Sequence, residues 1–205
     1  SLLVNGGVGI AAGYACNHIS YNLSEVIKGT VAYIQNQKIT DKALYKHITG
    51  PDLPQGARIL KDDGVYAAFA SGHGSIKVYG KWEVKKVPYK KKSKRDAIIV
   101  TSLASGSSER FLEKVKSAVD AGKIDQIVDA ADHSSTEGIH IELILKANAD
   151  AQMVIGQLLA HTNLYDTIGV NAMAIKEALP EMFGVKDIIA TWHKSRCKAL
   201  ISRYS

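Results

Sequence analysis

The chain has 205 residues, of which 46% are apolar, and its 26 Lys and Arg against 20 Asp and Glu give a formal net charge of +6. A chain of this length buries a substantial core, as one large domain or two small ones, which excludes disorder of the whole chain. No window approaches the roughly 18 uninterrupted apolar residues of a membrane span, and the first residues lack the features of a signal peptide. We therefore expect a soluble protein of the cytoplasm with no membrane partner.

The cysteines and histidines do not predict a metal site. Cys16 and Cys197 lie nearly the whole chain apart, and the seven histidines show none of the spacings typical of zinc ligands. The chain also begins without Met and directly with an apolar run, whereas natural domains usually begin with polar residues. We interpret it as a piece of a longer polypeptide.

The positive charge is concentrated in one segment. Nine basic residues lie between Lys77 and Arg95, where Glu83 is the single acidic residue, so this segment carries +8. The rest of the chain has 17 basic and 19 acidic residues, a net charge of −2. A local basic patch is typical of proteins that bind a polyanion such as nucleic acid. The alternative is a solvated Lys-rich loop that protects the edge of a sheet.

The glycine-rich start allows two interpretations from its residues alone. Gly7-x-Gly9-x-x-Ala12 fits the dinucleotide-binding fingerprint of oxidoreductases. That fingerprint also needs a second strand ending in an acidic residue about 20 positions later, and Glu25 instead belongs to the first turn of a predicted helix. The simpler interpretation is a tight turn that packs closely on its neighbour.

Helical spacing dominates the first part of the chain. Asn22 followed three residues later by Glu25 is typical of a capping box, and the apolar residues after it recur at helical spacing. This pattern predicts a helix over 23–35. Shorter helices are expected over 41–47 and 65–70.

The spacing changes to that of strands after Ile76. Apolar residues alternate with Lys up to Val87, which predicts a half-buried strand paired with 97–100 across the basic loop. The elements predicted after this hairpin are a helix over 107–121, strands over 124–130 and 138–145, a helix over 150–161, a strand over 167–175 and a helix over 185–204. The fold class is therefore α+β with a mixed or antiparallel sheet, and residues 97–175 follow the βαββαβ order of ferredoxin-like folds.

Several short motifs occur in a fixed order along the chain. They are Leu2-Leu3-Val4-Asn5-Gly6 with Gly9-Ile10-Ala11, Asn22-Leu23-Ser24-Glu25-Val26-Ile27, Gly50-Pro51-Asp52, Ser71-Gly72-His73-Gly74, Glu137-Gly138-Ile139-His140-Ile141, His161-Thr162-Asn163-Leu164 with Ile168-Gly169-Val170-Asn171, and Val185-Lys186-Asp187-Ile188-Ile189. Their order and spacing resemble the breakage-rejoining subunit of type IIA DNA topoisomerases, the gyrase A or topoisomerase IV C type. Two family stretches that contain proline are replaced at 17–22 and 101–108, so the resemblance is to a divergent member, such as a phage-encoded one.

The resemblance implies the tower segment of that subunit, which supports the arms of the duplex to be cut. Residues 1–60 would be the junction between the winged-helix domain and the tower, with a DNA-wedge loop. Residues 61–180 would be the α/β tower domain, and 181–205 the start of a long coiled-coil helix. The catalytic tyrosine and the Mg²⁺-binding TOPRIM acids of the family would lie outside this chain, so no catalytic or metal-binding residue is expected in it.

For the intact enzyme, the resemblance implies an ATP-dependent isomerase that passes one duplex through a transient double-strand break in another. Its partners would be double-stranded DNA, a second copy of itself in a homodimer, and a subunit that carries the ATPase and TOPRIM domains. Mg²⁺ and ATP would act through other domains or subunits, and the enzyme would work in a bacterial cytoplasm or a phage-infected cell. Gyrase and decatenating activities both stay open. A stand-alone basic nucleic-acid-binding module with a ferredoxin-like core is the alternative.

Ile10 matches the isoleucine that this family inserts between base pairs, and it is the first of the predicted DNA-binding residues. The others are Asn5, Gly9, His73, Lys77, Lys90, Lys91 and Lys92. The alternative for Ile10 is a buried aliphatic side chain. His73 and His140 stand where the family has arginine, so a phosphate contact there would be weaker and pH-dependent.

Overall fold

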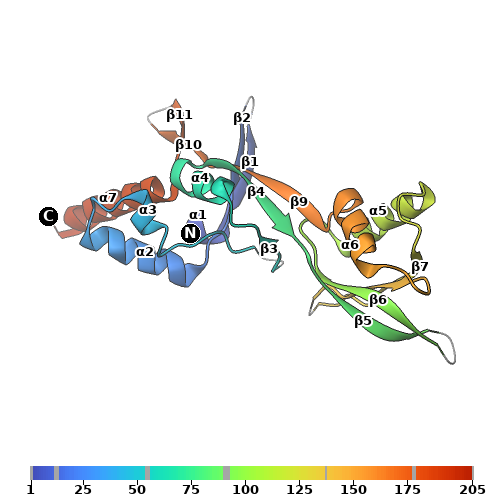
Figure 1. Cartoon of the computed structure of the whole chain (residues 1–205). Coiled ribbons are helices and arrows are strands. Elements are labelled where there is room, and N and C mark those ends of the chain that lie inside the picture. Colours follow the sequence, from blue (N-terminus) through green and yellow to red (C-terminus); the bar gives the residue numbers. More distant parts are fainter. Residues whose placement is uncertain are drawn as a thin grey trace. The chain divides into compact units, whose positions relative to one another are not determined.

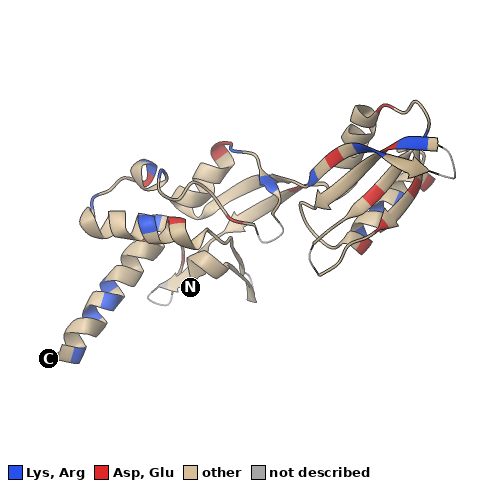
Figure 2. Cartoon of the chain, turned by 90° about the horizontal axis from the view of Figure 1, so that it is seen from below, with Lys and Arg blue, Asp and Glu red and all other residues tan. Residues whose placement is uncertain are grey.

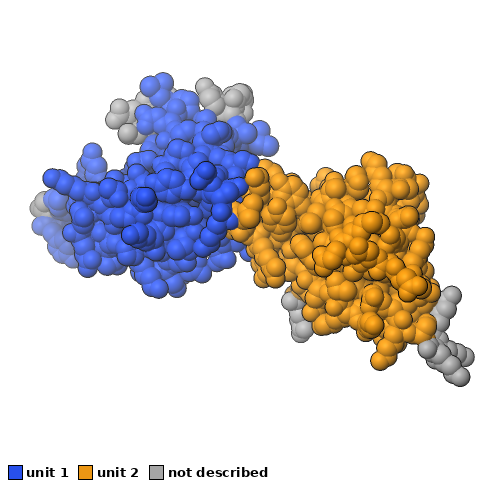
Figure 3. All heavy atoms as spheres, in the orientation of Figure 1, with its two compact units in different colours: residues 1–53, 61–76, 168–205 blue, residues 54–60, 77–167 orange. Residues whose placement is uncertain are grey.

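The computed structural model describes residues 2–11, 14–53, 56–89, 93–136, 138–176 and 179–204 (Figure 1). The chain forms two compact units, shown in Figure 3: unit 1 comprises residues 1–53, 61–76 and 168–205, and unit 2 comprises 54–60 and 77–167. The chain leaves unit 1 first for residues 54–60 and again within strand β4 (His73–Tyr79), and it returns the second time within β9 (Tyr165–Asn171). Each unit thus combines segments that are distant in the sequence.

Each of the three segments of unit 1 contains at least one helix. The helices are α1 (Leu2–Asn5), α2 (Leu23–Gln35), α3 (Asp41–Leu44), α4 (Asp63–Ser71) and α7 (Val185–Tyr204). Helix α2 begins as predicted, because the Asn22 side chain accepts hydrogen bonds from the N–H groups of Ser24 and Glu25. Glu25 does not complete a capping box: its carboxylate accepts from the N–H of Thr49 at 2.9 Å and so ties α2 to the segment after α3.

Two β-hairpins of unit 1 were not expected from the sequence. Strands β1 (Gly7–Ala11) and β2 (Tyr14–His18) pair antiparallel, as do β10 (Met173–Lys176) and β11 (Leu179–Met182). Both hairpins project beyond the helices of the unit (Figure 1). The single strand predicted over 167–175 is divided into β9 and β10, because the N–H of Ala172, between them, bonds the carbonyl of Gly72 at 2.7 Å instead of continuing one ladder.

A five-stranded sheet has the order β1-β2-β9-β4-β3, where β3 is Arg58–Ile59. The strand predicted over 76–87 is wrong as one element, since it forms β4 of this sheet and β5 (Lys81–Tyr89) of a second sheet. Gly80 separates the two strands: its N–H bonds the carbonyl of Leu164 at 2.7 Å, and a Cβ there would overlap the carbonyl of Ser102.

The second sheet lies in unit 2 and is antiparallel throughout. Its order is β5-β6-β8-β7, with β6 at Ser93–Ser102, β8 at Ile141–Leu145 and β7 at Ile127–Asp132. Helices α5 (Ser108–Asp120) and α6 (Ala151–His161) pack on one face of it. In a ferredoxin-like sheet β9 would lie next to β6. Here β5 has that place, because it continues directly into β6 as a hairpin, and β9 belongs to the other sheet.

The core of unit 2 follows the alternation seen in the sequence. Ile141, Leu143 and Leu145 are fully buried and pack with Phe111 of α5 and Leu158 of α6. The α+β class is thus confirmed. Within the described ranges, no helix is both long and apolar enough to cross a membrane.

Replacing Phe111 by Ala should destabilise unit 2 by about 3–5 kcal/mol, because it leaves a cavity among fully buried side chains. Trp82 packs against this core, whereas Trp192 lies in unit 1. Denaturant unfolding followed by Trp82 fluorescence in a Trp192→Phe background therefore reports on unit 2. Val128→Ala, at a 42% exposed position of the same sheet, is the control and should change little. Equal midpoints for the two variants would contradict this core assignment.

Candidate nucleic-acid interface

One face of the sheet in unit 1 is uncovered. Directly opposite residues of antiparallel strands share a face. Val8 pairs with Asn17, which pairs with Asn171, and Ile10 pairs with Ala15. The opposite face is covered by α4, since a Cβ at Gly74 of β4 would lie 2.8 Å from the carbonyl of Gly64. The unit 1 residues whose side chains or Cα atoms lie on the uncovered face are Val8, Ile10, Ala15, Asn17, His73, Ser75, Gly169 and Asn171, and none of these is acidic.

Side-chain hydrogen bonds hold strand β2 of the first hairpin to its neighbours. The Asn17 amide donates to the carbonyl of Gly169 at 2.6 Å, and the Asn171 amide donates to the carbonyl of Ala15. On the other side of β2, the Cys16 thiol donates to the carbonyl of Met173 at 3.2 Å. The hairpin is therefore attached along β2 to both β9 and β10.

Gly6 makes the turn from α1 into β1. Its φ of +66° lies in the left-handed region, and a Cβ there would lie 2.7 Å from the carbonyl oxygen of His18. Gly7 and Gly9 differ, because a Cβ would meet only ordinary contacts, at 3.7 Å from Leu2 and 4.0 Å from Cys16. Packing within the chain requires glycine at Gly6 but does not require it at Gly7 or Gly9.

Ile10 is 89% exposed, which excludes the alternative of a buried aliphatic residue. Its cross-strand neighbour, Ala15, is small and exposed, so the isoleucine side chain extends freely from the sheet. Gly7 and Gly9 lie inside β1 of an antiparallel hairpin. The dinucleotide interpretation is therefore wrong, because it needs these glycines in a loop that leads from a strand into a helix N-terminus.

The other predicted contact residues are distributed over both units. Asn5 is the exposed last residue of α1, Gly9 is exposed in β1, and His73 is the exposed first residue of β4. Lys77 is exposed on β4 in the part that belongs to unit 2. Lys90, Lys91 and Lys92 lie outside the described residues.

The described part of the basic hairpin in unit 2 has partners for several of its charges. The guanidinium of Arg95 lies 4.9 Å from the centroid of the Tyr89 ring, and the Lys85 ammonium lies 2.5 Å from a Glu83 carboxylate oxygen. Lys86 stands directly opposite Asp96. Acidic or aromatic residues therefore lie beside part of the positive charge of this hairpin.

Helix α7 is a second basic element. Comparing the charge of residues 77–95 with that of the rest of the chain did not reveal it. Its basic residues are Lys186, Lys194, Arg196, Lys198 and Arg203, against Asp187 alone (Figure 2). The exposed positions of its last turns carry most of them. Counting charge per predicted helix, instead of for one segment against the rest, would have found this element.

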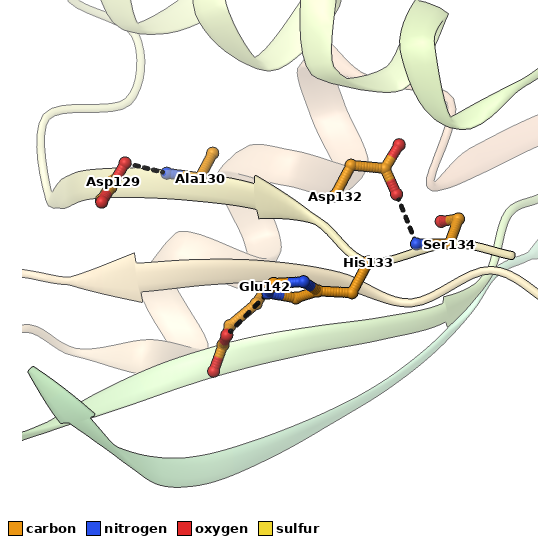
Figure 4. A network of polar contacts seen from close by, with 6 residues as sticks. All are labelled: Asp129, Ala130, Asp132, His133, Ser134 and Glu142. Atoms are coloured by element: carbon orange, nitrogen blue, oxygen red, sulfur yellow. Dashed lines mark hydrogen bonds and ion pairs between the residues drawn. The ribbon is translucent and has the colours of Figure 1, made fainter.

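The β7–β8 connection contains a polar network, and Figure 4 shows Asp132, His133, Ser134 and Glu142 of it. His140, a position that the sequence resemblance singled out, belongs to the same connection. The backbone N–H of His140 donates to the Ser134 hydroxyl at 3.0 Å. His133 lies 3.5 Å from the Glu142 carboxylate, and Asp132 accepts from the N–H of Ser134 at 2.8 Å. Hydrogen bonding from Ser134 lowers the pKa of Asp132, so the network retains negative charge. This arrangement suits a structural connection better than a phosphate site.

Clusters that could bind a metal ion are absent from the described part of the chain: no three His, Cys, Asp or Glu side chains are suitably placed there. The cysteines Cys16 and Cys197 are free thiols.

Comparison with known proteins identifies the family of this two-unit α+β chain. The family model for the A subunits of DNA gyrase and topoisomerase IV matches residues 1–205. The chain therefore belongs to this family, as its motifs indicated.

Curated relatives cover the chain almost completely. The DNA gyrase A subunit of Synechocystis sp. (strain ATCC 27184 / PCC 6803 / Kazusa) is 36% identical over 203 residues, which are 98% of this chain and 24% of the relative. The corresponding protein of Buchnera aphidicola is 34% identical over 204 residues, 99% of this chain and 24% of the relative. That of Rickettsia prowazekii is 36% identical over 204 residues, 99% and 22% respectively. The chain thus spans about a quarter of the length of these relatives.

Replacing Gly6 by Ala should destabilise unit 1 by more than the roughly 1 kcal/mol of left-handed backbone strain alone, because the new Cβ also meets the His18 carbonyl. Unfolding of unit 1 can be followed by Trp192 fluorescence in a Trp82→Phe background. Gly7→Ala is the matched control and should change the free energy of unfolding by less than about 0.5 kcal/mol. The structural role of Gly6 would be contradicted if both variants unfolded at the same denaturant concentration.

Proposed function

We propose that the chain is the DNA-binding and DNA-bending tower segment of an ATP-dependent type II DNA topoisomerase. Such an enzyme is an isomerase that passes one duplex through a transient double-strand break in another. The observation that carries the proposal is Ile10: it matches the wedge isoleucine of the family and is 89% exposed on a hairpin bonded to two neighbouring strands. Membership in the family supports the reaction class.

Ile10 acts as a wedge. An apolar side chain inserted from the minor groove partly unstacks one base step and bends the duplex, at a cost of a few kcal/mol that further protein contacts offset. The bonds of Asn17 and Asn171 keep the hairpin from yielding when DNA pushes against it. Gly9 lets the backbone beside the wedge approach the sugars, which accounts for a glycine that packing within the chain does not require.

Polar and basic residues hold the duplex by its phosphates, which position DNA without reading its sequence. Asn5 and His73 do so from unit 1, and Lys77 with Lys90, Lys91 and Lys92 do so from unit 2. Because none of the residues named on the uncovered sheet face of unit 1 is acidic, that face does not repel the phosphates.

In this proposal, the catalytic, ATPase and TOPRIM domains of the intact enzyme lie outside the chain. Residues 1–60 join a winged-helix domain that carries the catalytic tyrosine, residues 61–180 form the tower, and residues 181–205 begin the coiled coil of a homodimer. ATP and Mg²⁺ act through an ATPase/TOPRIM subunit or domain, so the segment alone has no topoisomerase activity. The place of action is the bacterial cytoplasm or a phage-infected cell.

Replacing Ile10 by Ala in the intact enzyme should abolish most DNA bending and cleavage, while duplex affinity falls less, because phosphate contacts supply most of the affinity. Bending is measured by energy transfer between dyes at the two ends of a duplex. Ile175→Ala is the matched control, since Ile175 is 81% exposed on the second hairpin of unit 1. Unchanged bending by the Ile10 variant would contradict the proposed wedge role of Ile10.

Neutralising Lys90, Lys91, Lys92 and Lys94 with Gln should flatten the salt dependence of duplex binding. Each lost phosphate contact reduces the magnitude of the negative slope of log K against log salt by roughly 0.9. The control variant replaces the same number of basic residues on α7, namely Lys194, Arg196, Lys198 and Arg203. If only the α7 variant shows a salt dependence of smaller magnitude, the phosphate contacts are made by that helix and not by the hairpin.

A further inference from the structure

Val8 is an exposed apolar residue that the wedge alone does not explain. Its side chain is 78% exposed and lies on the same face of β1 as Ile10, two residues away. The opposite residue, Asn17, is held toward β9 by its bond to Gly169. Burial within the chain gives no reason for an apolar residue at this position. Val8 is also not a single exposed apolar residue, because Ile10 lies beside it on the same face.

The distance between the side chains of Val8 and Ile10 along the strand matches the rise of two base pairs of DNA. Side chains two residues apart on a strand are separated by about 6.6 Å, because the rise is about 3.3 Å per residue. Two base pairs of B-DNA rise by about 6.8 Å. With β1 running along the minor groove and Ile10 in one base step, Val8 lies over the floor of that groove about two base pairs away.

The chemical groups on the floor of the minor groove depend on which base pair lies opposite Val8. An A·T pair shows only acceptors there, whereas a G·C pair adds the protruding amino group of guanine, a donor. The two methyl groups of Val8 offer no acceptor and exclude water, so the amino group would lose its hydrogen-bond partner.

We infer that Val8 is a specificity-determining residue that favours A·T over G·C about two base pairs from the step that Ile10 opens. The inference deepens the proposed function and rests on it, because Ile10 sets the register of the hairpin on the duplex.

The test uses the intact enzyme and duplexes that differ only in the base pairs two positions from the bend. Competition binding should favour A·T over G·C by about fivefold or more, as expected for one donor left unpaired. An inosine·C pair, which lacks the guanine amino group, should bind like A·T. Equal binding to all three duplexes would overturn the inference.

Val8→Thr is the sharpest variant, because it exchanges one methyl group for a hydroxyl that can accept from guanine. It should reduce the preference to less than about twofold, whereas Val8→Leu should keep the preference. Val128→Thr in unit 2 is the matched control. A Val8→Thr enzyme with the wild-type preference would overturn the inference.

Ile10→Ala separates this result from the proposed function. That variant should lose bending on every duplex, together with the preference, because the register is lost. If it bends DNA normally, the wedge proposal fails whatever base preference Val8 shows.

Discussion

The attachment of β2 to β9 is the interaction on which the candidate interface depends. A two-stranded hairpin alone is marginally stable in water. Here the amides of Asn17 and Asn171 each donate to a backbone carbonyl of the opposite strand, and Cys16 bonds the carbonyl of Met173 from the other side. These bonds join residues more than 150 positions apart and help to make the hairpin part of a larger sheet.

Strands β4 and β9 explain why the two units form from interleaved segments. Each strand begins in one unit and ends in the other, so the middle of the chain, residues 77–167, is inserted between two parts of unit 1. Unit 2 has its own core around Phe111 and Leu143, independent of the hairpins.

An apolar groove of about 640 Å³ in unit 1 shows how burial can differ from what a helical pattern suggests. The apolar stripe of α2 predicted that helix correctly, yet Ile27, Val31 and Ile34 are about half exposed along the groove, next to Trp192 of α7. A periodic pattern identifies the apolar face of a helix. It cannot say whether other parts of the same chain cover that face.

The sequence by itself determined the longer helices, the α+β class and the family, but not the short helix α1. Capping residues and apolar spacing are local, and α2 and α7 have the bounds that they predicted. Only the tertiary structure decided that the glycine-rich start is a hairpin, that 76–87 is two strands in two sheets, and that β5 replaces β9 beside β6. Those choices depend on backbone pairing between distant residues and on steric limits such as those at Gly6 and Gly80, which no local pattern records. For Ile10, the sequence supplied the family match, and the fold supplied the exposed position on an attached hairpin.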